Sequence, residues 1–116
     1  MEPINLARKL EEFSTFWAPK IVGGFNGHDL MVVKLKGEFV WHDHPETDDF
    51  FLCLSGRLLI DLPDRVVELA PGEMFVVPRG VQHRPRAEVE THVLLIEPAG
   101  TPNTGDPATA TVKQRI

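Results

Sequence analysis

Two histidines, His42 and His44, stand two positions apart in the segment Trp-His-Asp-His-Pro and are the first candidates for chemistry. On an extended strand, side chains two residues apart point to the same side, so both imidazoles would project from one face. Neutral imidazole is the commonest metal ligand in proteins. The spacing therefore indicates that His42 and His44 can share one ion.

A third histidine, His83, ends a second segment that begins at Gly72. Within this segment a strand-like apolar run is followed by the turn sequence Pro-Arg-Gly, so that a histidine is expected on the far side of a strand and a turn. A third ligand would have to come from such a position. His28 lies in the turn sequence Gly-His-Asp, and we interpret it as a solvated side chain.

The glycine and proline spacing around these histidines resembles the cupin family. The first cupin motif is a glycine, an H-x-H pair, a carboxylate four or five positions later and then a glycine, and it is met by Gly37, His42, His44, Asp49 and Gly56. The second motif, G-x5-P-x-G-x2-H, is met by Gly72, Pro78, Gly80 and His83. The two motifs together are specific, whereas either alone is weak.

The resemblance implies an all-β, single-domain jelly-roll (cupin) barrel whose ligands to one divalent transition metal are His42, His44, His83 and Asp49. Such a ligand set suits Fe, Mn, Ni, Cu or Zn and leaves positions open for water, oxygen or a substrate. Asp49 stands where the family normally has glutamate, so it can bind the ion directly, bind through a water, or leave the ion to the three histidines. A metal-free barrel that binds a small molecule is the alternative.

Asp48 and Asp49 are adjacent, and only one of them can point inward if the strand has already begun. Asp49 has the interval to Gly56 that the motif requires, and by alternation it shares a face with Phe51 and Cys53. We therefore expect Asp49, and not Asp48, at the metal site. The unpaired Cys53 is interpreted as a small buried hydrophobe.

Short apolar runs separated by turn residues favour an all-β fold. The expected strands are 31–36, 50–54, 58–62, 74–77 and 93–96, and Asn26-Gly27 predicts a hairpin turn. Before them, Leu6, Leu10 and Phe13 recur at helical spacing, which indicates a short amphipathic helix that Asn5 could cap. After Glu97 the sequence is rich in proline, glycine and threonine, so we expect a cupin domain at 1–97, helix included, and a tail at 98–116 that is disordered or lies across the barrel or a partner subunit.

Composition excludes several classes of partner. The chain has 116 residues with 17 acidic and 12 basic side chains, a net charge of -5, and therefore lacks the basic surface that nucleic acid requires. No apolar run approaches the roughly 20 residues of a membrane span, and the first residues lack a basic leader region. The expectation is a cytoplasmic protein whose partner is a small molecule.

Strand alternation also predicts what surrounds the ion. The inward residues should be apolar and offer no obvious base; they are Val40, Phe51, Cys53 and Pro85. His92 could enter the pocket together with Leu94 and Ile96, although a structural role is the stronger interpretation. A second apolar face, which would need cover from the helix or from a homodimer, is formed by Phe39, Trp41, Phe50, Leu52 and Leu54.

The resulting function hypotheses belong to two classes. The first is a metalloenzyme that acts on a small organic molecule, as a dioxygenase or as a sugar isomerase or epimerase; the absence of a base among the expected lining residues slightly favours the dioxygenase. The second is a module that binds or senses a small molecule without catalysis. The sequence names neither the substrate nor the metal.

Overall fold

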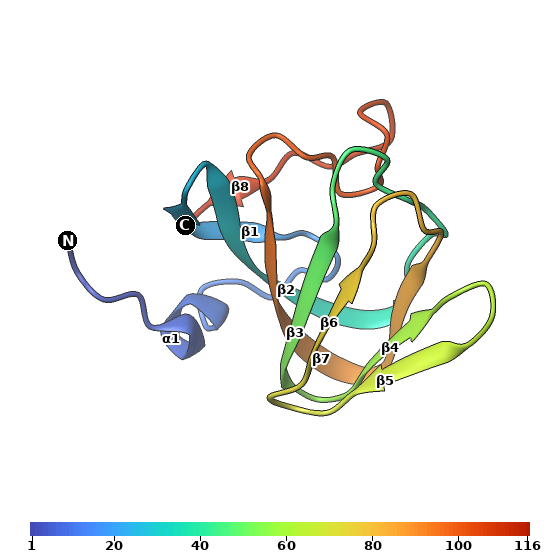
Figure 1. Cartoon of the computed structure of the whole chain (residues 1–116). Helices are drawn as coiled ribbons and strands as arrows, with labels where there is room; N and C mark the ends of the chain where they lie inside the picture. The colour runs from blue at the N-terminus through green and yellow to red at the C-terminus, as the bar shows by residue number, and fades with distance from the viewer.

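The computed structural model describes residues 1–116 and shows one β-barrel with a short helix at its side (Figure 1). The elements in chain order are α1 (Leu6–Leu10), β1 (Lys20–Phe25), β2 (His28–Glu38), β3 (Asp49–Ser55), β4 (Leu58–Asp61), β5 (Val66–Leu69), β6 (Met74–Val77), β7 (Arg84–Pro98) and β8 (Gln114–Arg115). The all-β expectation is confirmed. The runs at 50–54, 58–62 and 74–77 form β3, β4 and β6 with small shifts of boundary.

Strand β7 holds the barrel together because it pairs with three others. It runs antiparallel to β2 over almost its whole length, while its beginning also pairs with β4 and its second half with β3. Between these two halves, residues 88–90 are exposed and the register with β2 shifts. One strand thereby belongs to both walls, which closes the sheet around a single interior.

The helix α1 is shorter than the apolar spacing suggested, because Phe13 lies beyond its end. Asn5 caps it as expected, with its side-chain oxygen accepting from the backbone N–H of Arg8 at 3.1 Å. Leu10 packs against Val22 and Val32 on the outer side of β1 and β2. This helix, the chain's only one, has neither the length nor the apolar character needed to cross a membrane.

The β1–β2 hairpin shows why Asn26-Gly27 was informative. Both residues have positive φ, 49° at Asn26 and 76° at Gly27, as a tight hairpin turn of the primed type requires. The strand before this turn, β1, was not predicted, since Gly23 and Gly24 interrupt its apolar pattern. Strand β5 was also missed, because only Val66, Val67 and Leu69 mark it and it pairs with β4 alone.

The interior of the barrel is filled by apolar side chains from every long strand. Its fully buried members include Met31 on β2, Cys53 on β3, Leu58 and Ile60 on β4, and Val93 on β7. Cys53 is a core residue, as expected. The buried polar side chains of His42, His44, Asp49 and His83 gather at one end of this apolar interior, and the candidate site lies there.

The second apolar face has a different composition from the one expected. Phe39 does not belong to it, because its ring stacks on Trp17 at a centroid distance of 5.1 Å inside the pocket described below. Leu54 packs with the cluster beneath α1, and Trp41 lies apart beside Arg84. The pairing of β3 with β6 and β7 instead places six outward residues in two rows: Ile96, Phe50 and Val76, and Leu94, Leu52 and Met74. Of these, Leu94 also packs with the cluster beneath α1.

Candidate metal centre

The three histidines come from two loops that are joined by backbone hydrogen bonds. His42 and His44 lie between β2 and β3, and His83 lies between β6 and β7. The His42 N–H donates to the His83 carbonyl at 3.0 Å, and the His83 N–H donates to the His42 carbonyl at 2.9 Å. His42 therefore sits on an isolated bridge and His44 in the loop after it, so neither lies on a regular strand, but both side chains are buried.

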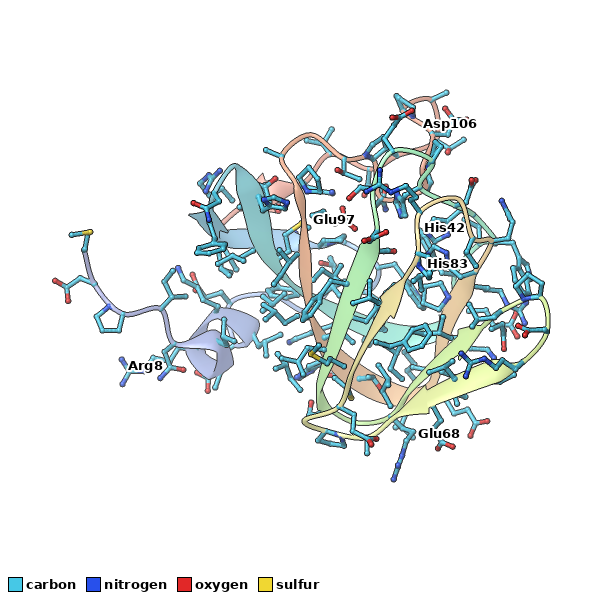
Figure 2. All side chains as sticks on the ribbon, in the orientation of Figure 1. Arg8, His42, Glu68, His83, Glu97 and Asp106 are labelled. Atoms are coloured by element: carbon cyan, nitrogen blue, oxygen red, sulfur yellow. The ribbon has the colours of Figure 1, made fainter.

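Asp49, the first residue of β3, meets these histidines. Its Oδ2 is 3.0 Å from His83 Nε2 and 3.3 Å from His44 Nε2, and the potential ligand atoms of all four residues lie within 4.8 Å of one another. All four side chains are buried. His42 and His83 stand together at one end of the barrel, under the loop that carries Asp106 (Figure 2). The structure thus brings together every expected ligand.

Backbone carbonyls fix the ring orientation of two histidines. His42 Nδ1 is 2.9 Å from the Val40 carbonyl and His83 Nδ1 is 2.9 Å from the Val81 carbonyl. Because a carbonyl can only accept, both Nδ1 atoms carry the proton, and the Nε2 atom of a neutral ring is left with its lone pair. Metal-binding histidines are held in this way.

The contact between His83 Nε2 and Asp49 Oδ2 then poses a physical problem. A lone pair 3.0 Å from a carboxylate oxygen is repulsive unless a cation lies between them, either a proton that makes the ring an imidazolium or a metal ion. The other oxygen of the carboxylate, Asp49 Oδ1, is buried and has no hydrogen-bond partner. A divalent cation would satisfy both groups, so the residues present fit a metal ion.

The pKa shifts in the metal-free chain follow from the same contacts. Burial lowers the pKa of His42 to about 4, although its hydrogen bond to Val40 acts in the opposite direction. The low pKa keeps this ring neutral and able to bind a cation. Burial opposes ionisation of Asp49, but His44 and His83 overcome it and lower its pKa. Burial likewise opposes the charged form of His44, yet the carboxylate of Asp49 raises the pKa of that ring.

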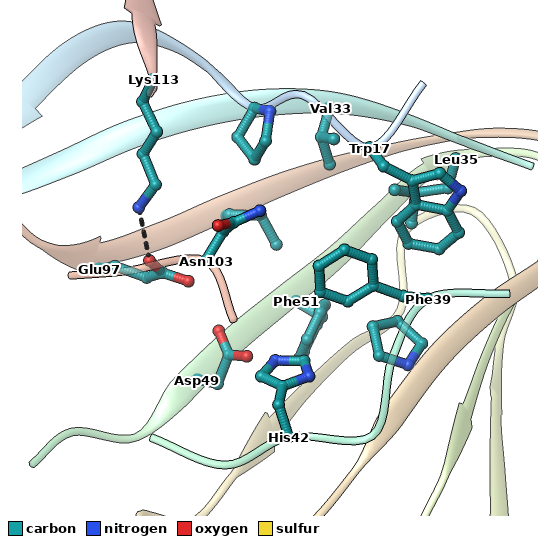
Figure 3. Close-up of a pocket in the computed structure, with 13 residues that line it drawn as sticks. Trp17, Val33, Leu35, Phe39, His42, Asp49, Phe51, Glu97, Asn103 and Lys113 are labelled. Carbon is teal, nitrogen blue, oxygen red and sulfur yellow. Dashed lines mark hydrogen bonds and ion pairs between the residues drawn. The ribbon is translucent and has the colours of Figure 1, made fainter. Parts of the chain in front are cut away.

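A cavity of about 40 Å³ opens beside His42 and Asp49. One side is apolar and includes the stacked rings of Trp17 and Phe39, while Glu97, Asn103 and Lys113 gather on the opposite side (Figure 3). The remaining lining residues are Pro19, Val33, Leu35, Phe51, Pro85 and Leu95. The site is therefore a group of potential metal ligands at the wall of a mostly apolar pocket.

The expected lining was partly wrong. Phe51 and Pro85 line the pocket, but Val40 is 54% exposed and Cys53 lies deeper in the core. His92 faces outward, with Nε2 2.7 Å from a carboxylate oxygen of Glu90. The error about His92 arose because both faces of β7 are apolar here, so the sequence does not show whether the even-numbered or the odd-numbered residues point inward.

The same uncertainty about the inward face of β7 is why Glu97, a carboxylate in the pocket, was missed from the sequence. Val93 and Leu95 face the interior, so Glu97 does as well, although the expected strand ended before it. Burial and the nearby Asp49 raise the pKa of Glu97 to about 7, against the effect of Lys113 at 3.1 Å. The pocket therefore contains a potential proton acceptor, which corrects the expectation of a lining without a base.

Comparison with known proteins identifies the fold. Residues 29–97, more than half of the chain, match the cupin domain family. The chain belongs to the cupin family. A solved cupin-2 domain protein from Shewanella frigidimarina superposes with a TM-score of 0.81 at 40% identity, covering 82% of this cupin and 93% of that chain.

Two curated relatives are also similar. The uncharacterised protein YdbB of Bacillus subtilis is 37% identical over 73 residues, which are 62% of this cupin and 65% of YdbB. The 3-hydroxyanthranilate 3,4-dioxygenase of Brucella anthropi is 33% identical over 85 residues, which are 65% of this cupin and 46% of the dioxygenase. The chain thus spans less than two thirds of the length of each of these relatives.

The adjacent aspartates provide a test of the register of β3. Asp48 is exposed and accepts from the backbone N–H of Arg79 at 3.0 Å, whereas Asp49 faces the histidines. Asp49→Asn should weaken metal affinity by roughly 10-fold to 100-fold if the carboxylate acts through a water, and by more if it binds the ion directly. The matched variant Asp48→Asn should change it little. Isothermal titration with Zn²⁺ measures both, and loss of affinity in Asp48→Asn alone would contradict the assignment.

Proposed function

We propose that this cupin is a metal-dependent enzyme that acts on a small organic molecule. The observation that carries the proposal is the buried convergence of His42, His44, His83 and Asp49 at the wall of a pocket. The bound ion, one of Fe, Mn, Ni, Cu or Zn, would act as a Lewis acid or redox centre with positions open to substrate. The neighbouring residues would hold the substrate and exclude water.

A dioxygenase is the first reaction class. The apolar side of the pocket suits the carbon skeleton of a small organic substrate, and the similarity to the Brucella dioxygenase over 85 residues supports this reading. A sugar isomerase or epimerase is the second class, and the carboxylate of Glu97 favours it because such reactions need a group that accepts a proton near the ion. A module that binds a small molecule without converting it is the alternative. It would use the same pocket, and only the absence of a reaction product would distinguish it from an enzyme.

Metal content tests the site itself. Purified protein should contain one divalent ion per chain, and the double variant His42→Ala/His44→Ala should contain none, since it loses two of four ligands. His28→Ala is the matched control because His28 is an exposed residue at the start of β2. Elemental analysis measures all three proteins, with circular dichroism to establish that they are folded. Equal metal content in the wild type and the double variant would show that the site is wrong.

Reaction class can be separated with one panel of compounds. We expect metal-loaded protein to consume oxygen with at least one member of a panel of small phenols, diketones and sugar acids, and the double histidine variant to consume none. Conversion of a sugar acid without oxygen uptake would favour the isomerase class, as Glu97 would allow. Saturable binding with no conversion of any compound would contradict catalysis and support a binding module.

We also propose a homodimer formed through the outward face of β3, β6 and β7. Met74 is 61% exposed and Val76 is 40% exposed, next to the outward residues Phe50 and Leu52. Contiguous apolar surface of this kind is costly to leave in water, and a second copy of the same face would cover it.

Light scattering tests the dimer at micromolar concentration. The wild type should give about twice the 13.0 kDa of one chain, and Met74→Lys/Val76→Lys should give the mass of one chain because it places two charges in the contact. Val89→Lys, at an exposed position outside this face, is the control and should remain dimeric. A wild-type mass near 13.0 kDa would refute the proposal.

A further inference from the structure

The C-terminal segment 99–116 lies outside the part of the chain that matches the cupin family, yet it is packed onto the site. It leaves β7, passes over the end of the barrel and returns as β8, which pairs in parallel with β1 (Figure 1). On the way, Gly105 lies so close to the loop between the first two histidines that a Cβ there would collide with the carbonyl oxygen of Asp43. The segment and the histidine loop are therefore in direct contact.

Two side chains of this segment enter the pocket. Lys113 donates to Glu97 at 3.1 Å and to the carbonyl of Thr101, which occupies two of its three N–H donors. Asn103 accepts from the backbone N–H of Thr111 through its oxygen at 3.0 Å. No hydrogen bond within the chain uses the amide N–H groups of Asn103, so the pocket side of the segment is rich in donors (Figure 3).

The charge of the pocket indicates which ligand these donors would meet. Lys113 is the cation of the lining, against the two carboxylates of Asp49 and Glu97. A divalent ion at the four-residue site would then leave one net positive charge in a buried space. Because an unbalanced charge is expensive in such a space, a ligand with one negative charge is favoured over a neutral or cationic one.

The size of the cavity adds a second restriction. About 40 Å³ is room for a few atoms, whereas a benzene ring occupies a cavity of about 150 Å³. A carboxylate group fits this space, and because the pocket is partly open, the rest of a larger molecule would extend out of it. The C-terminal segment is one of the walls, and its contacts with the barrel include the Lys113–Glu97 pair, the contact at Gly105 and the pairing of β8 with β1.

We propose that the C-terminal segment is the specificity-determining wall of this pocket, and that Lys113 and Asn103 select a ligand that presents a compact, singly charged oxygen anion such as a carboxylate. The inference rests on the proposed metal site, because the ion supplies the excess positive charge. Lys113 balances Glu97 and presents its remaining N–H to the anion. Asn103 adds neutral donors beside it.

Acetate and acetamide are suitable probes because they have nearly the same shape and differ in charge. Protein loaded with Co²⁺ at pH 8 reports binding through the visible absorption of the ion. Acetate should bind the wild type at least tenfold more tightly than acetamide. Lys113→Met should weaken acetate binding by about 10-fold to 100-fold, whereas Glu97→Gln should strengthen it, because it removes a negative charge from the pocket.

The opposite signs are the decisive feature of this test. Both substitutions break the same ion pair, so a purely structural role of the pair would shift acetate affinity in the same direction in both variants, and that result would overturn the proposal. Asn103→Leu leaves the pair in place and serves if Lys113→Met fails to fold: acetate affinity should fall about tenfold, and an unchanged value would refute the proposal. Absence of Co²⁺ uptake by the wild type would refute the metal site itself, and with it the charge balance used here.

Discussion

The need to neutralise Asp49 inside the barrel is the constraint on which the site depends. A buried carboxylate is tolerated only with a cation or several hydrogen-bond donors, yet its Oδ1 has no partner and its Oδ2 faces imidazole nitrogens. The carbonyls of Val40 and Val81 hold the protons of His42 and His83 on the far side of each ring. The backbone thus dictates that lone pairs converge on a negative charge, an arrangement that is stable only around a positive one.

Strand β7 is the element that places this group in an enclosed space. Its pairing with β2, β3 and β4 closes the barrel, and its alternation sends Val93 and Leu95 into the core and Glu97 to the pocket. The apolar side chains beneath the site exclude water and so strengthen the electrostatic contacts above them. The same face of β7 therefore contributes both to the core, through Val93 and Leu95, and to the pocket, through Glu97 two residues further on.

The sequence predicted the site residues that local motifs mark. It did not predict those that depend on which face of a strand points inward or on how a distant segment folds back. His42, His44 and His83 were identifiable because turn residues at fixed intervals surround them, and Asp49 was preferred over Asp48 because of its distance from Gly56. Glu97 was missed because both faces of β7 are apolar, so alternation alone did not define the inside. Lys113 and Asn103 could not have been found at all, since nothing in a segment rich in proline, glycine and threonine indicates how it folds back on a barrel.

The short strand β8 has a consequence for the behaviour of the protein in solution. The backbone of β1 is paired with β2 on one side, and on the other side its partner is β8, through Lys20 with Gln114 and Ile21 with Arg115. An edge strand without such cover offers unpaired N–H and carbonyl groups to other chains. Strand β8 therefore covers the first two residues of β1, and its removal would expose their backbone groups to pairing with a strand of another chain.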